Sequence, residues 1–93
     1  MDVKVKLLKA LSDETRIKIL QCLLDGEQCA CSVVPPVGKS QSTISQHLRM
    51  LKEAGVVESR RDGVNIWYKI KSKKALQIME FLDIQGIKSK IKC

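Results

Sequence analysis

The sequence predicts a mainly α-helical domain with one β-hairpin, and three observations support this fold class. Five segments carry helical patterns or helix-start signals, most of them with apolar residues three and four positions apart. Two β-type segments flank Asp62-Gly63, a strong signal for a two-residue hairpin turn. The length of 93 residues suits one domain. The predicted order of four helices, a hairpin and a last helix is that of a winged helix-turn-helix domain.

The first two helices are expected over residues 3–11 and about 13–24. Each carries leucine, isoleucine or valine on one face at helical spacing. Ser12 offers a side-chain oxygen that can cap the start of the second helix. Gly26 tolerates the left-handed backbone that ends helices, so we expect the second helix to end before it.

A short third helix is expected within residues 29–37. Its sequence, CACSVVPPV, contains Pro35 and Pro36. Proline removes a backbone donor and clashes with the preceding turn. We therefore expect this helix to end at the prolines or to be distorted there. Gly38 and Lys39 follow as a tight turn.

The fourth helix is predicted over residues 41–54, with Ser40 as its N-cap and Gly55 just beyond its end. Ile44, Leu48 and Leu51 recur on one side and predict the buried face. Short polar side chains fill the opposite side. A helix that reads the DNA major groove needs such donors and acceptors, with one or two longer Gln or Arg residues reaching the base edges.

The hairpin is predicted over residues 56–70, and the last helix over 72–85 with Ser72 as its cap. Gly86 is expected to end or bend that helix. Arg60 and Arg61 lie beside the hairpin tip, where a wing reaches the DNA backbone or minor groove.

Charge is distributed unevenly along the chain. Residues 1–38 hold five basic and five acidic residues, so the whole net charge of +7 lies in residues 39–93. A basic excess on the predicted helix-turn-helix and wing favours a polyanionic partner, namely double-stranded DNA. The expected DNA-binding residues are Lys39, Ser40, Gln41, Ser42, Thr43, Ser45, Gln46, His47, Arg49, Arg60 and Arg61. His47 is expected to be structural or to contact phosphate, because a lone histidine has no neighbouring metal ligand.

Several other classes are disfavoured by composition. Three aromatic residues cannot form a stacking platform for single strands. The chain has no signal-peptide core and no apolar run long enough for a membrane span, so we expect a cytoplasmic protein with reduced cysteines. A protein-interaction module is disfavoured by the nine basic and three acidic residues in 39–74. Without a CxxC motif, a thiol oxidoreductase is disfavoured, and we expect no enzyme activity.

Three stretches carry a family resemblance that covers about residues 7–70: ALSDETRIKILQCLL, CACS, and SQSTISQHLRMLKEAGVVESRRDGVNIWYKI. Together they resemble the ArsR/SmtB family of metal- and metalloid-sensing repressors. The resemblance implies a homodimeric winged helix-turn-helix protein that inducer binding releases from operator DNA. It places the helix-turn-helix at about 29–54 and the wing at about 56–70. The helices at about 3–11 and 72–85 would form the dimer interface.

The same resemblance implies that Cys29 and Cys31 supply thiolates to As(III)/Sb(III) or Cd(II)/Pb(II), since soft ions prefer sulfur. DNA binding itself would need no cofactor. A third cysteine three residues after the pair is missing, because Val34 stands there, so Cys93 or Cys22 is the tentative third ligand. Two alternatives remain open, namely a redox switch at the Cys pair and a regulator without a metal inducer. A zinc site on the last helix is excluded, because residues 73–90 contain no histidine.

Overall fold

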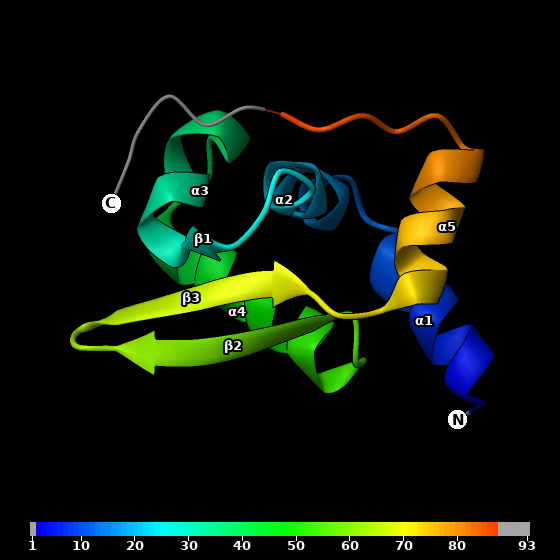
Figure 1. Ribbon diagram of the computed structural model, residues 1–93, viewed down its shortest axis with the longest axis horizontal. Helices are drawn as coiled ribbons and strands as arrows, with labels where there is room; N and C mark the ends of the chain where they lie inside the picture. Colours follow the sequence, from blue (N-terminus) through cyan, green and yellow to red (C-terminus); the bar gives the residue numbers. More distant parts are fainter. Residues whose placement is uncertain (1, 88–93) are drawn as a thin grey trace.

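The computed structural model describes residues 2–87, and it confirms the predicted fold class (Figure 1). The elements are α1 (Val3–Leu11), α2 (Glu14–Leu23), β1 (Gln28–Cys29), α3 (Ala30–Val37), α4 (Gln41–Glu53), β2 (Val57–Asp62), β3 (Asn65–Ile70) and α5 (Lys73–Phe81). Among the described residues, no helix is both long and apolar enough to cross a membrane.

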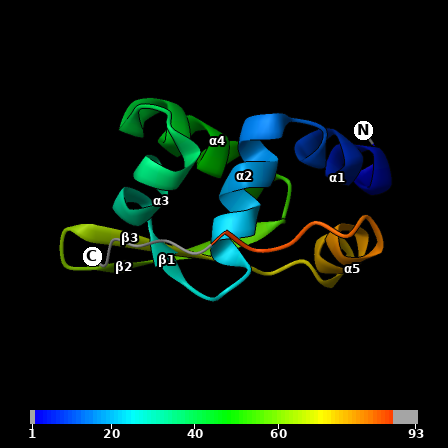
Figure 2. The same cartoon turned by 90° about the horizontal axis from the view of Figure 1, so that it is seen from above.

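The hairpin of β2 and β3 projects at one end of the molecule, and α1 and α5 lie at the other end (Figures 1 and 2). Helix α2 runs between these two ends. The core forms where α2, α3 and α4 meet the base of the hairpin, and Ile19, Ile44, Leu48 and Val56 are all fully buried there. This packing leaves the opposite face of α4 open to solvent.

The cap of α2 differs from the sequence expectation. Asp13, and not Ser12, is the N-cap, since its carboxylate accepts a hydrogen bond from the backbone N–H of Arg16 at 3.0 Å. Ser12 instead ends α1, and its hydroxyl donates to the carbonyl of Lys9 at 3.0 Å. Both residue types can cap a helix, but Asp13 directly precedes the first residue of α2, so Asp13 is the one that reaches the free amides. The bond from Arg16 is the main reason that the pKa of Asp13 lies below its ordinary value.

Asp13→Ala is expected to lower the free energy of unfolding by about 1 kcal/mol, since it removes the cap of α2. The lowered pKa of Asp13 means that its contribution is present above pH 3.8 and is lost as the pH falls through the folded-state pKa. Urea unfolding at pH 7 and at pH 3 measures this. Asp13→Asn is the control, because its amide caps at both pH values; an equal difference between Asp13→Ala and wild type at both pH values would contradict the charged cap.

Helix α3 continues through both prolines to Val37, so the expected ending of the helix at the prolines is wrong. Val33 and Val37 are buried one turn apart, and their packing against the core outweighs the backbone bonds that the prolines remove. Gly38 ends α3 in the left-handed conformation, with φ of 77°. The short strand β1 was not predicted at all. It pairs antiparallel with β3, which gives a three-stranded sheet in the order β1-β3-β2.

The hairpin turn is shifted by one residue from the prediction. Asp62 and Asn65 form the last pair of the ladder, so Gly63 and Val64 are the two turn residues. Gly63 has φ of 64°, which suits the first turn position of a type II′ hairpin. Val64 therefore lies outside the strands, at the tip of the hairpin, with 97% of its surface exposed.

Helix α5 ends four residues earlier than the expected boundary at 85. Asp83 has φ of 62°, and this left-handed backbone stops the helix after Phe81. The chain then turns back across α2, where the N–H of Ile87 donates to the carbonyl of Gln21 at 3.0 Å. Gly86 thus neither ends nor bends the helix, but lies close to the backbone of α2.

Candidate nucleic-acid interface and thiol segment

The start of α4 is fixed by a network of hydroxyl groups. The Ser40 oxygen accepts the backbone N–H of Thr43 at 3.2 Å, and it also lies 3.0 Å from the Thr43 hydroxyl and 3.2 Å from the Ser42 hydroxyl. Ser40 was predicted as the N-cap, and the structure confirms it. These hydroxyls and the free amides of the first turn together present donors at the end of α4, a suitable place for a phosphate.

The polar face of α4 points to solvent, because Ile44, Leu48 and Leu51 hold the opposite face in the core. Almost all of the side chains predicted on this helix and the preceding turn to bind DNA are on the open face. The exposed ones are Lys39, Ser40, Gln41, Ser42, Ser45, Gln46 and Arg49, and Thr43 is half-buried. The arrangement presents a row of donors and acceptors along one helix, with Arg49 as the longest of them.

His47 lies at the side of α4 that packs against α2. Its Nδ1 is 3.3 Å from a guanidinium nitrogen of Arg16 and 4.0 Å from the Asp13 carboxylate. Its side chain is only 21% exposed. These contacts favour the structural role among those proposed for His47, since they link α4 to the start of α2.

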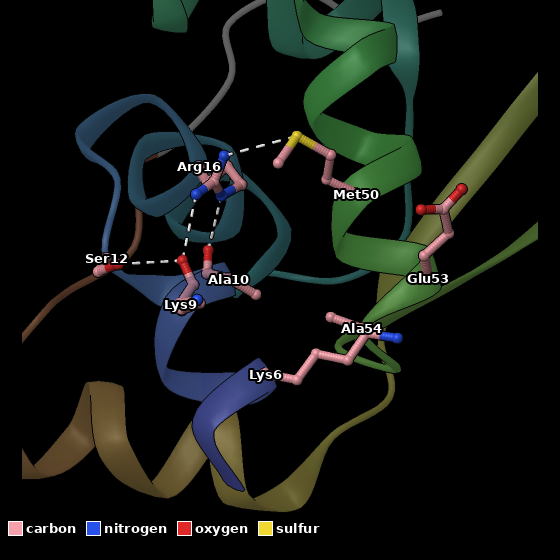
Figure 3. A pocket seen from close by; sticks show the side chains of 8 residues that line it. All are labelled: Lys6, Lys9, Ala10, Ser12, Arg16, Met50, Glu53 and Ala54. Carbon is pink, nitrogen blue, oxygen red and sulfur yellow. Dashed lines mark hydrogen bonds between the residues drawn. The ribbon is translucent and has the colours of Figure 1, made fainter. Parts of the chain in front are cut away.

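Arg16 connects three helices. Its guanidinium donates to the carbonyls of Ala10 at 2.8 Å and Lys9 at 3.1 Å, the last turn of α1, and it contacts the Met50 sulfur of α4 at 3.7 Å (Figure 3). A cation at a helix C-terminus satisfies free carbonyls and the helix dipole. An open hollow of about 680 Å³ lies beside this contact, and Figure 3 shows the side chains that line it. Because Arg16 is fully engaged with protein groups, it acts here as a link between helices.

The two arginines of the wing differ in their surroundings. Arg60 donates to both oxygens of Glu27 at 2.6–3.0 Å, and its guanidinium lies 5.6 Å from the centre of the Trp67 ring. This pairing lowers the pKa of Glu27. Arg61 is exposed and makes no ion pair within residues 2–87. Of the two, Arg61 is the side chain that is available to a phosphate.

The thiol segment precedes the helix-turn-helix. Cys29 is the N-cap of α3, and its sulfur accepts the N–H of Cys31 at 3.4 Å. The Cys29 sulfur also lies 3.9 Å from Oδ1 of Asn65 on β3, to which its S–H donates. Cys29 is a free thiol that is only 3% exposed, whereas Cys31 is disulfide-bonded in this structure.

Of the two candidate third ligands, Cys22 is not brought to this segment. Cys22 is 1% exposed within the hydrophobic core, and burial raises the pKa of its thiol. A buried thiol with a raised pKa is a poor source of thiolate. Cys93 lies outside the described residues. Within residues 2–87, no group of three or more His, Cys, Asp or Glu side chains is placed to hold a metal ion.

Sequence reasoning missed three residues that organise this site: Arg16, Glu27 and Asn65. Each acts on a partner more than thirty positions away, so no local pattern reveals it. The run Gln28–Cys29 is too short for a strand pattern, and it becomes β1 only because β3 supplies the pairing. The sequence signal for Glu27 is weak: it is an acid that precedes a hairpin with two adjacent arginines.

The fold and the exposed helix define a winged helix-turn-helix regulator of the DNA-binding class. A family model described as "Bacterial regulatory protein, arsR family" matches residues 13–59. The chain therefore belongs to the arsR family of bacterial regulatory proteins, and the resemblance seen in the sequence is confirmed.

Individual relatives agree with this family. The chain is 42% identical to the cadmium resistance transcriptional regulatory protein CadC homolog of Staphylococcus aureus, over 86% of this chain and 66% of that protein. It is 37% identical to the arsenical resistance operon repressor of the same organism, over 84% and 75%. It matches the homodimeric winged helix-turn-helix DNA-binding domain of Mb0332 from Mycobacterium bovis, with a TM-score of 0.81, 29% identity, and coverage of 89% and 77%. The chain thus spans about two thirds of the length of the CadC homolog.

Proposed function

We propose that this chain is a cytoplasmic homodimeric repressor that binds operator DNA and is released by a thiophilic metal or metalloid at Cys29 and Cys31. The observation that carries the proposal is the position of Cys29 as the N-cap of α3, the first helix of the helix-turn-helix. A ligand at this sulfur acts directly on the unit that holds α4. The helix-turn-helix at about 29–54 and the wing at about 56–70 form the DNA-binding unit.

The homodimer is supported by an apolar groove between α1 and α5. Val3 and Phe81 are 79% and 89% exposed, and Leu8 and Leu82 are also largely exposed. An exposed apolar patch of this kind favours an interface. Helices α1 and α5, which line the groove, lie at the end of the molecule away from the wing (Figure 2). A two-fold axis at this end would place two α4 helices for two DNA half-sites.

The inducer class follows from the donor set. Two sulfurs from one helix start suit soft ions such as As(III), Sb(III), Cd(II) or Pb(II), and relatives of this chain are named for cadmium and arsenical resistance. Both sulfurs must be reduced thiols to bind such an ion. With two ligands among the described residues, a third ligand comes from Cys93, from a second copy of the chain or from solvent.

A redox switch is the second candidate, and one observation favours it. Cys31 is disulfide-bonded in this structure while Cys29 is free, so oxidation at Cys31 is compatible with the fold. A bond between Cys29 and Cys31 themselves would close a small, strained ring. In this alternative, an oxidant and not a metal changes DNA affinity.

A mobility-shift titration of the full-length chain on its own upstream region tests both candidates. The chain is reduced first, and the arms are arsenite, Cd(II), Zn(II) and an oxidant. Release by arsenite or Cd(II) alone supports the metal sensor, and release by the oxidant alone supports the redox switch. If the chain stays bound to DNA in all arms, both proposed inducers are refuted. If it binds random DNA as tightly as its upstream region, specific operator binding is refuted.

Arg61→Ala is expected to lower the slope of log affinity against log salt by about 0.9, the value for one phosphate contact. The same loss should occur on operator and on random DNA, since phosphate contacts carry no sequence information. Arg60→Ala is the matched comparison, and its slope should change less because Glu27 already pairs with Arg60. An unchanged slope for Arg61→Ala would remove the wing tip from the interface.

A further inference from the structure

The Cys29 sulfur connects two parts of the DNA-binding unit. On one side it accepts the N–H of Cys31 in the first turn of α3, and on the other its S–H donates to Asn65 at the start of β3. Asn65 directly follows the wing turn and pairs with Asp62 across it. The thiol is therefore one hydrogen bond away from the tip of the wing.

The residues around Cys29 are tied to both wing strands. Glu27 holds Arg60 of β2 through three short contacts, and Cys29 pairs with Trp67 of β3 in the sheet register. Arg61, the exposed arginine proposed to contact phosphate, follows Arg60 in the chain. A continuous set of contacts thus runs from the thiol to the residue expected to meet DNA.

On the α3 side, the thiol segment is held firmly. The Ser32 hydroxyl donates to the carbonyl of Cys29 at 2.8 Å, and Ser32 and Val33 are 1% exposed. The wing tip has no comparable support, as Val64 is almost fully exposed. A disturbance at the Cys29 sulfur is therefore more easily accommodated by movement of the wing than by movement of α3.

We propose that Asn65 is a positioning residue that transmits ligand binding at Cys29 to the wing, with the Glu27–Arg60 pair as the second link. The inference rests on the proposed metal-sensing function. When a metal–sulfur bond forms at Cys29, the thiol proton passes to water. Oδ1 of Asn65 then loses the hydrogen bond that the Cys29 S–H donated to it. Since Cys29 is 3% exposed, an ion also reaches the sulfur only if a covering group such as Asn65 withdraws. Both changes shift the start of β3, so the wing and Arg61 leave their DNA-binding positions.

The experiment uses the full chain, reduced with a phosphine, and Cd(II) as the probe. Three quantities are measured: the ultraviolet cadmium–thiolate absorbance, the emission of Trp67, and operator affinity with and without Cd(II). Trp67 is the only tryptophan, it lies opposite Cys29, and its indole N–H is buried without a hydrogen-bond partner among the described residues. Its emission therefore reports on the middle of the wing hairpin, where Trp67 pairs with Arg60.

In the wild-type chain, Cd(II) should alter Trp67 emission and lower operator affinity. Asn65→Ala should retain the cadmium–thiolate absorbance, but its change in Trp67 emission should be smaller. The release factor, by which Cd(II) lowers operator affinity, should also shrink, by roughly fivefold or more. Glu27→Gln keeps the side-chain size and removes the charge, and it should shrink the factor in the same direction. Val64→Ala, at the neighbouring turn position, should keep the wild-type factor.

Different results refute the metal site and its link to the wing. If the wild-type chain shows no cadmium–thiolate absorbance, the proposed metal site is refuted, and this inference with it. If wild type binds Cd(II) and releases DNA, and Asn65→Ala and Glu27→Gln do so with the same factor and the same Trp67 change, only the link to the wing is refuted. Because the factor is a ratio, a variant that weakens metal-free DNA binding still gives a decisive result.

Discussion

Arg49→Ala is expected to lower affinity for operator DNA by about 1–3 kcal/mol, which is the discrimination of one good base contact. Arg49 is the longest exposed side chain on the polar face of α4, and its guanidinium has the fork that recognises guanine. Gln46→Ala, on the same face one turn earlier, should lose affinity over a similar range. Fluorescence anisotropy with labelled operator, at one fixed salt concentration, measures both.

The specificity ratio distinguishes base reading from general attraction. For Arg49→Ala and Gln46→Ala, affinity for random DNA should fall much less than affinity for the operator, so the ratio falls. Lys18→Ala is the matched control for a lost positive charge, because Lys18 lies on α2 and pairs with Glu14. An equal loss on operator and random DNA would show that Arg49 contacts phosphate and reads no base.

The elements that the sequence predicted well are those whose signals are local. The helices at 3–11 and 41–54 and the cap at Ser40 follow from spacing and from one side chain, and the structure has them at or within one residue of the expected bounds. The errors occur where a distant contact decides. Helix α3 keeps Pro35 and Pro36 because buried valines hold it, and α5 stops early because Asp83 adopts a left-handed backbone that residue type alone does not predict.

In the candidate DNA interface and thiol segment too, features set by local sequence could be predicted and those set by distant contacts could not. The exposed face of α4 could be predicted, since periodicity separates Ile44 and Leu48 from Gln46 and Arg49. The difference between Arg60 and Arg61 could not, because it depends on Glu27, which the fold brings across the sheet. The surroundings of Cys29 were equally hidden, since both β1 and its contact with Asn65 exist only after the hairpin has formed.

Cys29→Ser is expected to abolish release of operator DNA by Cd(II) or arsenite while leaving metal-free DNA binding close to that of wild type. The serine hydroxyl can still accept the Cys31 N–H as the α3 cap and donate to Asn65, so the fold is preserved. It cannot replace thiolate as a ligand for a soft ion. Cys31→Ser should have the same effect on release. Mobility shifts with increasing Cd(II) or arsenite, on reduced protein, give the concentration that releases half of the DNA.

Cys22→Ala is the matched control, because its sulfur is buried in the core and its raised thiol pKa disfavours the thiolate. This variant should release DNA at the wild-type inducer concentration, even if the small core cavity lowers its stability. If Cys22→Ala abolishes release and Cys29→Ser does not, the sensing thiol lies on α2. If the double variant Cys29→Ser with Cys31→Ser still releases DNA normally, the inducer acts elsewhere, and the position of Cys29 at the start of α3 serves only to cap the helix.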